Sequence, residues 1–391
     1  MPQLARSRYD AAIIGAGPVG LALAIELARI DLAVLVVERR PPPDEEAGLR
    51  PQLLVARPGD LANLESLGLD TGDPELVSGL ATRCEGDVAS GRFARGIVQT
   101  ADFATIGPTD LRTLASQRPI GLVPIGRLQR ALLDRARLHG IDVVYDCEVG
   151  KLRRHASAIS LACTDGTSVV ASIAIIATGA ARALIAPTKA TATSSPSRRM
   201  IGGVFATSGP LARWIRLELP IAHGTARATV LETTAATGAG TAILVDVPVD
   251  NRDDAILHEG FAAAAHHQGL DGERFVSAPS VFATSITTVS HRFIGGDDRA
   301  PIAIAGDAAQ TGHVFTGQTC FVNLALARGL AGNLRHARAA IVDGRSNDPA
   351  LVNALAHYDR QSRLGAEILA QRSERHVIHH PMGHWALAGV A

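Results

Sequence analysis

The first forty residues alternate between apolar runs and a segment of strong helix formers. Residues 10–15 and 32–37 are short and largely apolar, and residues 21–28 between them are rich in Ala and Leu. Short continuous apolar runs are typical of buried strands, whereas Ala and Leu favour helix. The pattern therefore predicts a strand, a helix and a second strand, in that order.

The remaining pattern combines helices with a long strand-rich region. Helical spacing of apolar residues predicts helices at 61–68, 128–139, 253–268, from near Gln318, and at 348–375. Strand-like runs occupy 93–99, 141–149, 158–163, 168–170, 173–177 and 300–305. Residues 200–294 are largely strand-like, with their clearest runs at 228–232 and 241–248. The polar segment 187–198 predicts a crossing between domains.

The turn between the first strand and the first helix is a Gly-x-Gly-x-x-Gly loop, formed by Gly15, Gly17 and Gly20. In a dinucleotide-binding turn, the first glycine permits a tight bend and the second lets the backbone approach a pyrophosphate. The third lets the helix and the strand pack closely. The helix N-terminus adds free amides and a partial positive charge. Glycine-rich turns also occur as purely structural loops, so the flanking elements carry the prediction of a nucleotide site.

An acidic residue completes this arrangement. Glu38 follows the second apolar run, 18 residues after Gly20. A carboxylate at that place accepts hydrogen bonds from ribose hydroxyls and repels a 2′-phosphate. The N-terminal segment therefore predicts a site for FAD or NAD.

Composition excludes several other classes of protein. The 391 residues are 47% hydrophobic and 19% charged, with 38 basic and 38 acidic residues, so nothing indicates a nucleic-acid partner. The N-terminus lacks the apolar core of a signal peptide, and the longest apolar stretch, 11–25, falls short of the ~20 residues that span a bilayer. Four cysteines without metal-ligand spacing predict reduced thiols and no metal site: Cys84, Cys147, Cys163 and Cys320. We expect a soluble, cytoplasmic protein.

A second landmark lies near the C-terminal third. The apolar strand at 300–305 ends in Gly306 and Asp307, and a helix is expected to begin near Gln318. A carboxylate at the end of a parallel strand can accept hydrogen bonds from the ribityl hydroxyls of FAD. The amides of the next helix, around Thr319 and Cys320, can stabilise negative charge on a reduced flavin. The alternative is that Asp307 only caps a helix.

These landmarks, in this order, resemble the flavoprotein monooxygenases of the p-hydroxybenzoate hydroxylase type. Four segments carry the resemblance: 15–38, Arg50-Pro-Gln52 with the helix at 61–69, Gly306-Asp307-Ala308-Ala309, and His357 to Arg363. The resemblance implies that Arg50 reaches the FAD phosphates and that the backbone of Val149 meets the adenine, although packing alone would also explain a valine. With the residues above, the expected cofactor contacts further include Val19, Arg39, Gln52, Arg127 and Gly179.

The chain departs from the family pattern at several positions. Thr178-Gly179 stands where the family has Asp-Gly, and this leaves the mode of nicotinamide use open. Gln310 replaces a histidine, Val314 replaces a proline, and Thr319-Cys-Phe321 replaces a glycine-x-asparagine run. The flavin-contacting residue expected before the 128–139 helix is Ile125, with Arg127 as a possible substitute.

The resemblance implies an α/β fold with two domains. An FAD-binding Rossmann-type domain of the glutathione-reductase kind is expected to comprise 1–70, 120–190 and 296–345. A substrate-binding α+β domain on a mostly antiparallel sheet is expected to comprise 71–119 and 191–295. Residues 346–391 are expected to form a C-terminal helix and tail.

The implied function is that of a monooxygenase. NADH or NADPH would reduce FAD, molecular oxygen would form a flavin C4a-hydroperoxide, and one oxygen atom would pass to a small organic substrate by hydroxylation or epoxidation, in natural-product biosynthesis for example. Two alternatives are an FAD-dependent dehydrogenase or reductase without oxygen insertion, and a non-redox FAD-containing cyclase. His313 is the candidate catalytic residue, with hydrogen bonding within its loop or exposure at the surface as the alternative. Aromatic residues make up only 4% of the chain, and this favours an apolar, aliphatic pocket.

Overall fold

The computed structural model describes residues 6–42, 52–80, 120–181, 183–185, 190–195, 198–222, 224–247, 253–314 and 317–378. Its helices are α1 (Pro18–Ala28), α2 (Pro58–Ser66), α4 (Ile125–Leu138), α5 (Asp254–His267), α6 (Thr319–Arg335), α7 (Arg338–Val342) and α8 (Pro349–Ile378), with a 3-10 turn η3 (Gly306–Ala308).

The largest sheet in the described chain has a parallel centre. Its strands are β1 (Tyr9–Ile14), β2 (Val34–Val37), β6 (Asp142–Val144), β7 (Val149–Arg154), β8 (Ile159–Cys163), β9 (Ser168–Ile176), β17 (Phe293–Ile294) and β18 (Ile302–Ile304). They are ordered β17-β18-β9-β1-β2-β6, and the antiparallel hairpin β7–β8 joins through β9. Because β18, β9, β1 and β2 are parallel neighbours, their carboxyl ends meet at one edge.

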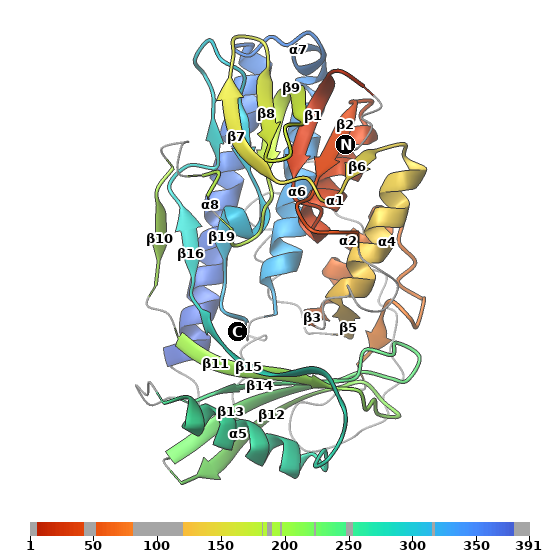
Figure 1. Cartoon of the computed structure of the whole chain (residues 1–391), viewed down its shortest axis with the longest axis vertical. Helices are drawn as coiled ribbons and strands as arrows, with labels where there is room; N and C mark the ends of the chain where they lie inside the picture. The colour runs from red at the N-terminus through yellow and green to blue at the C-terminus, as the bar shows by residue number, and fades with distance from the viewer. Residues whose placement is uncertain are drawn as a thin grey trace.

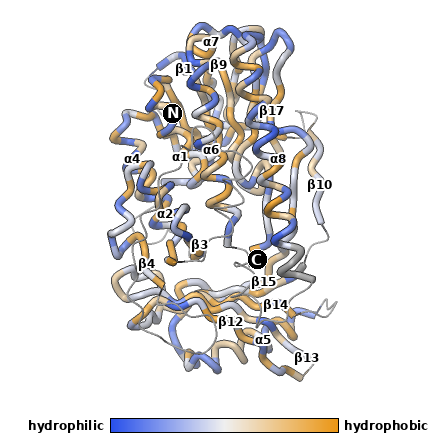
Figure 2. The backbone as a smooth tube through the Cα atoms, turned by 180° about the vertical axis from the view of Figure 1, so that it is seen from behind, coloured by the Kyte–Doolittle hydropathy of each residue, from blue (hydrophilic) through white to orange (hydrophobic). Residues whose placement is uncertain are grey.

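Helices cover one face of this sheet. Helix α1 packs against α4 and α6, and α8 packs along α6 (Figure 1). Apolar residues follow the central strands, whereas polar residues mark the outer turns (Figure 2). Tyr358 of α8 is buried and donates a hydrogen bond of 2.8 Å to the carbonyl oxygen of Ile304. The C-terminal helix is therefore anchored directly to β18.

A second sheet is antiparallel and lies below the first in the view of Figure 1. It is ordered β12-β13-β14-β11-β15, from the strands β11 (Arg198–Phe205), β12 (Arg213–Ile221), β13 (Gly224–Glu232), β14 (Thr241–Asp246) and β15 (Phe275–Thr284). Helix α5 covers one face, with Ile201 and Val245 among the buried residues of that core. The predicted α/β fold with a mostly antiparallel second sheet is confirmed.

Two small sheets lie between these units. They are β3-β5-β4, from β3 (Leu53–Ala56), β4 (Ser78–Gly79) and β5 (Gly121–Pro124), and β10-β16-β19, from β10 (Ala192–Ser194), β16 (Thr287–Val289) and β19 (Gln310–Thr311). Val55 and Leu122 of the first pack with Val204 and Leu231 of the large antiparallel sheet. This cluster holds the antiparallel sheet to the rest of the molecule on the face opposite α5.

Local details differ from the predicted elements. The single strand expected at 141–149 is divided into β6 and β7, because Asp146 has φ 53°, which extended backbone does not allow. The strands expected at 168–170 and 173–177 form one continuous strand, β9. Helix α4 begins at Ile125, three residues earlier than expected. The strand expected at 93–99 lies outside the described residues, and the domain boundaries stay predictions. Among the described helices, none is long and apolar enough to cross a membrane.

Candidate cofactor site

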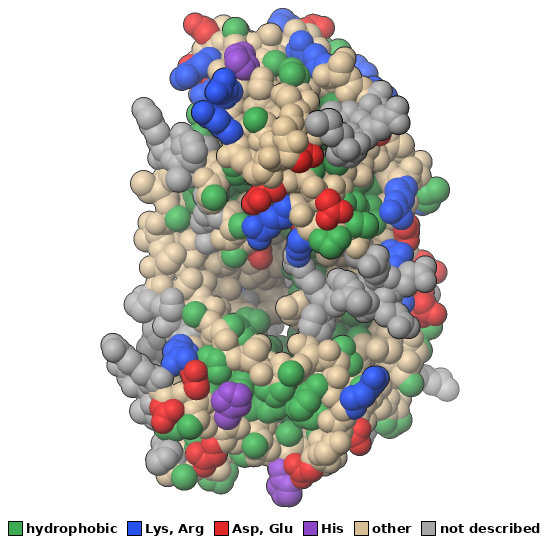
Figure 3. Space-filling view, viewed as in Figure 1, with side chains coloured by type: hydrophobic (Ala, Val, Ile, Leu, Met, Phe, Trp, Pro, Cys, Tyr) green, Lys and Arg blue, Asp and Glu red, His purple; other side chains and the backbone are tan. Residues whose placement is uncertain are grey.

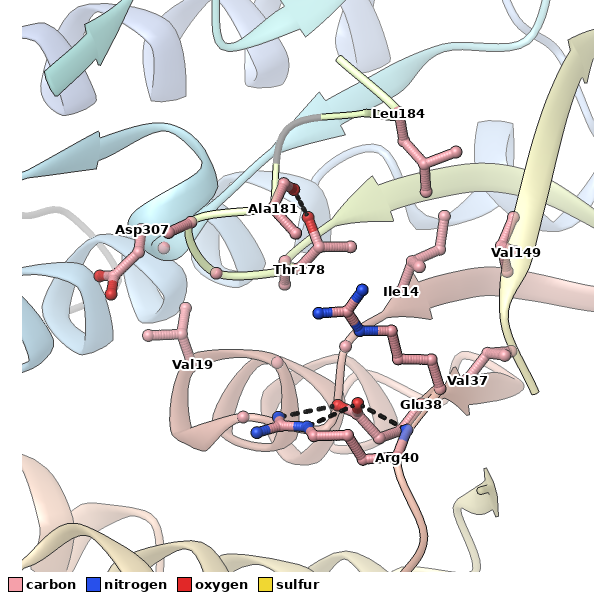
Figure 4. Close-up of a pocket in the computed structure, with 18 of the residues that line it drawn as sticks. Ile14, Val19, Val37, Glu38, Arg40, Val149, Thr178, Ala181, Leu184 and Asp307 are labelled. Atoms are coloured by element: carbon pink, nitrogen blue, oxygen red, sulfur yellow. Dashed lines mark hydrogen bonds and ion pairs between the residues drawn. The ribbon is translucent and has the colours of Figure 1, made fainter. Parts of the chain in front are cut away.

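A cavity of about 460 Å³ opens at the carboxyl edge of the parallel strands. Ten of the residues predicted from the sequence line it: Gly15, Gly17, Val19, Gly20, Glu38, Arg39, Val149, Gly179, Asp307 and Cys320. Asp307 lies at one end, above Val19, and Glu38 and Val149 lie toward the other (Figure 4). The fold therefore brings the two landmarks of the sequence into a single cavity.

Each of the three glycine positions in the loop needs glycine for a different structural reason. Gly15 has φ +117°, and a Cβ there would overlap the carbonyl oxygen of Ala177. A Cβ on Gly20 would overlap the carbonyl oxygen of Gly15, so helix and loop could not pack at their present separation. Gly17 differs, because a Cβ built on it meets no atom within 4 Å apart from its own neighbours in the chain. It is the N-cap of α1 and lines the cavity, so the open space beside it is available to a ligand.

Glu38 is buried and is hydrogen-bonded to the backbone of the glycine loop. Its carboxylate accepts hydrogen bonds from the N–H of Ala16 at 2.9 Å, the N–H of Arg40 at 3.1 Å and the Nε of Arg40 at 3.0 Å. Burial opposes ionisation of this group, but the hydrogen bonds and charge of Arg40 and the Ala16 amide outweigh it and hold the pKa of Glu38 below its ordinary value. Glu38 is therefore a fixed negative charge at this end of the cavity (Figure 4).

Two residues that were not predicted from the sequence support this end. Arg40 lines the cavity and pairs with Glu38. Gln129 of α4 is buried and donates a 2.7 Å hydrogen bond from Nε2 to the carbonyl oxygen of Ala16. A polar residue on the buried face of an amphipathic helix was the only available signal for Gln129.

The Asp307 end is built from a turn and a helix. Gly306 has φ +66°, and a Cβ there would meet Val19 at 3.3 Å, so the turn lies directly against the start of α1. Asp307 is half-buried and lines the cavity. The N-cap positions of η3 and α6 are occupied by Ala305 and Gln318, not by Asp307. Cys320, in the first turn of α6, also lines the cavity, as expected for a helix N-terminus directed at it.

A chain of buried side chains orients Asp307. Asn323 Nδ2 donates to Asp307 Oδ1 at 3.0 Å, and Gln310 Nε2 donates to Asn323 Oδ1 at 3.2 Å. Ser362 of α8 donates to Gln310 Oε1 at 3.2 Å. Each amide is thus oriented by the next group, back to the C-terminal helix. Gln310 stands where the resemblance expects histidine, and Asn323 lies two residues beyond the expected glycine-x-asparagine run.

The end of β9 closes the cavity from above. Thr178 and Gly179 line it, and Thr178 Oγ1 donates to the carbonyl oxygen of Ala181 at 2.6 Å (Figure 4). Gly179 has φ +68°, as a left-handed turn requires. The Thr-Gly segment therefore forms a turn that returns the chain over the cavity.

Several predicted residues lie away from the cavity lining. Gln52 is exposed, and Arg127 is exposed and pairs with Glu75 at 3.8 Å, whereas Ile125 lines the cavity. The Thr319 hydroxyl accepts a hydrogen bond from the N–H of Gly312. Arg50 lies outside the described residues.

His313 is not part of the cavity lining either. Its side chain is buried, and its backbone N–H donates to Ser373 Oγ of α8 at 2.8 Å. The residue belongs to the packing between the 310–314 loop and α8, so its catalytic role stays a prediction.

The residues present fit FAD. Open space beside Gly17 accommodates a pyrophosphate at the N-terminus of α1, and Glu38 provides an acceptor for ribose hydroxyls. Asp307 provides an acceptor at the opposite end, beside the first turn of α6. One elongated ligand with hydroxyls on both sides of a diphosphate satisfies all three features.

Comparison with known proteins agrees with this geometry. The model of the family described as FAD binding domain matches residues 8–343. This chain belongs to that family. No curated protein matches the sequence. The resemblance to flavoproteins of the p-hydroxybenzoate hydroxylase type is confirmed, and FAD is the cofactor of this fold.

Solved structures share the fold at low identity. A probable FAD-dependent monooxygenase from Pseudomonas aeruginosa, PqsL, is 18% identical with a TM-score of 0.67, covering 97% of this chain and 99% of that one. A p-nitrophenol 4-monooxygenase from Pseudomonas putida is 15% identical with a TM-score of 0.66, covering 97% and 91%. A ternary complex of aklavinone-11 hydroxylase with FAD and aklavinone is 19% identical with a TM-score of 0.63, covering 100% and 72%.

Proposed function

We propose that this FAD-binding protein is a monooxygenase that uses NADH or NADPH and molecular oxygen to hydroxylate or epoxidise a small organic substrate. The convergence of Asp307, the glycine loop and the first turn of α6 on one cavity is the observation that carries the proposal. The fold shared with FAD-dependent monooxygenases supports it. Bound FAD would supply the redox chemistry, by accepting a hydride and then reducing oxygen.

The chain's own residues would place and polarise the cofactor. Glu38 would accept hydrogen bonds from ribose hydroxyls, and the N-terminus of α1 at Gly17 would bind the diphosphate. Asp307, held by Asn323, would accept hydrogen bonds from the ribityl chain. The first turn of α6 at Cys320 would stabilise negative charge that develops on the ring.

The face of the antiparallel sheet opposite α5 is the expected substrate surface. A Cβ on Gly202 would meet Leu244 Cδ2 and, at 3.2 Å, Phe282 Cε1, so these residues share one face. Leu244 and Phe282 are only half-buried. The molecular surface is hollowed between this sheet and the upper unit (Figure 3). Apolar side chains along such a hollow favour a largely apolar substrate.

The test is oxygen-coupled turnover of the purified protein. The purified protein should be yellow. A substrate should stimulate oxidation of NADH or NADPH, with one oxygen molecule consumed for each molecule of hydroxylated product. Equal turnover without oxygen would instead indicate a dehydrogenase or reductase. Turnover in which FAD stays oxidised throughout, without nicotinamide, would indicate a cyclase.

A further inference from the structure

Two cysteines beside the cofactor cavity have their sulfur atoms in unusually close contact. Cys147 lies between β6 and β7, Cys163 ends β8, and both are buried. Their Sγ atoms are 2.6 Å apart. This is shorter than the ~3.5–4.0 Å separation typical of non-bonded carbon atoms and longer than the ~2.05 Å of a disulfide bond. A shift of about half an ångström would bring the two atoms to bonding distance.

We propose that Cys147 and Cys163 form a disulfide that braces the Glu38 end of the FAD site. The bond itself depends on no assignment of the catalysed reaction. Its effect on the cofactor depends only on FAD occupying the cavity that Cys147 and Val149 line.

The backbone already holds the two residues together. Val149 pairs with Cys163 across the β7–β8 ladder, and the N–H of Thr164 donates to the carbonyl oxygen of Glu148 at 2.8 Å. Cys147 lies two residues before Val149, just outside this ladder, so the pairing of Val149 with Cys163 brings Cys147 close to Cys163. The approach of the sulfurs is therefore a consequence of strand register.

The same segment contacts the cofactor site through its backbone. The N–H of Cys147 donates to the carbonyl oxygen of Glu38 at 3.0 Å. A bond from Cys147 to β8 would therefore fix the position of the β6–β7 turn relative to Glu38. Pre-ordering this wall before FAD binds would slow cofactor release.

The chemistry requires a two-electron oxidant, for which hydrogen peroxide suffices. One thiol attacks the peroxide and becomes a sulfenic acid with release of one water, and the second thiol displaces the sulfenic oxygen as a second water. Two S–H bonds and one O–O bond break, one S–S bond and two O–H bonds form, and peroxide is reduced to two water molecules. Burial, together with its neighbour Cys147, raises the pKa of Cys163 to about 12, and burial also raises the pKa of Cys147. Both thiols are therefore neutral near pH 7, so the oxidation should be slow.

A bound metal ion explains the short distance between the two sulfur atoms less well than a disulfide does. Asp165 is the third group near the two sulfurs, but it is exposed, and its carboxylate accepts from the N–H of Thr167 at 2.8 Å and from the hydroxyl of Thr167 at 2.9 Å. Two thiolates bound to one tetrahedral zinc at ~2.3 Å each would lie well over 3 Å apart. The observed sulfur separation of 2.6 Å is too short for that arrangement.

The test is a thiol count and peptide map of the FAD-loaded full-length protein. After exposure to hydrogen peroxide, alkylation in denaturant should block only two of the four cysteines, and both Cys147 and Cys163 should escape. The protein mass should fall by ~2 Da before alkylation, and a reductant should restore all four thiols. Cys147→Ala and Cys163→Ala should each leave the other position alkylated, while Cys84→Ala should leave the linked peptide intact.

FAD release then tests the bracing effect. The oxidised protein should release FAD more slowly than the reduced protein, and this difference should vanish in Cys147→Ala and in Cys163→Ala. Alkylation of both residues after peroxide treatment, or a link to another cysteine, would overturn the disulfide. Zinc co-purifying at one equivalent and lost in both variants would do so too. Equal FAD release by the mapped oxidised and reduced forms would overturn the bracing effect.

Discussion

The two ends of the cofactor cavity are built in different ways. At the first end, the loop of Gly15, Gly17 and Gly20 and the carboxylate of Glu38 come from one short stretch of chain. At the other end, Asp307 depends on Asn323 and, through Gln310, on α8. The first end depends mainly on close backbone packing that only glycine allows. The second depends on a relay of side-chain hydrogen bonds that runs from Ser362 through Gln310 and Asn323 to Asp307. We therefore expect an added Cβ at Gly15 or Gly20 of the first end to affect folding, and substitutions at the second end to affect cofactor binding.

The largest expected effect is that of Gly15→Ala or Gly20→Ala. Either added Cβ overlaps a carbonyl oxygen, and at Gly15 the φ of +117° adds backbone strain. Each should lower the free energy of unfolding by about 3 kcal/mol, measured by denaturant titration of the FAD-free protein.

Gly17→Ala is the matched control within the same loop. Apart from its own neighbours in the chain, no atom lies within 4 Å of its added Cβ, so the unfolding midpoint should stay close to that of the wild type. FAD affinity should nevertheless fall by about tenfold or more, because the methyl group enters the space of the diphosphate. If Gly15→Ala, Gly20→Ala and Gly17→Ala lost equal stability, Gly17 would serve backbone packing as the other two glycines do, and not space for the ligand.

Asp307→Asn should weaken FAD binding without unfolding the protein. Hydrogen bonds to a charged group contribute about 1.5–3 kcal/mol, so the dissociation constant should rise roughly 10- to 100-fold. Fluorescence titration of the FAD-free protein with FAD measures this. Stoichiometric FAD retained by Asp307→Ala through purification would contradict the assignment of this residue.

Asn323→Leu should have a smaller effect in the same direction. The substitution removes the Asn323 donor to Asp307 and the acceptor of Gln310. The binding free energy of FAD should weaken by about 1 kcal/mol, so the FAD dissociation constant should rise roughly fivefold. Ser362→Ala, two hydrogen bonds further from Asp307, should weaken FAD binding less than Asn323→Leu does. If Asn323→Leu bound FAD as the wild type does, the relay would have no role in placing Asp307.

The smallest expected effect is on acid stability. Because Glu38 has a lowered pKa in the folded protein, its contribution to stability is present above the unfolded value of about 4.3 and is lost as pH falls through the folded pKa. Glu38→Gln should flatten the stability profile below that pH, measured by unfolding of the FAD-free protein. Exposed Glu148→Gln is the control and should leave the slope unchanged. If the free energy of unfolding of Glu38→Gln still fell with pH as steeply as that of the wild type, the loss of stability in acid would come from other carboxylates.

Prediction from the sequence was most complete where the relevant residues are neighbours in the chain. The strand–helix–strand unit, the glycine loop and Glu38 follow from local pattern, and β1, α1 and β2 confirm the predicted elements. It was less complete for α4, which begins at Ile125, and for 141–149, which Asp146 divides. A positive φ at a residue other than glycine is decided by its surroundings and carries little sequence signal.

The sequence by itself predicted the parallel core, an FAD site and Glu38 and Asp307 as its two carboxylates, because strand ends and glycine turns are encoded by adjacent residues. Only the tertiary structure decided that Gln129 supports Ala16 and that His313 packs against α8. It also decided that Asn323 donates to Asp307 and that Ser362 supports this contact through Gln310. These contacts join residues far apart in the chain. Their partners are set by how the helices pack on the sheet, which no local pattern records.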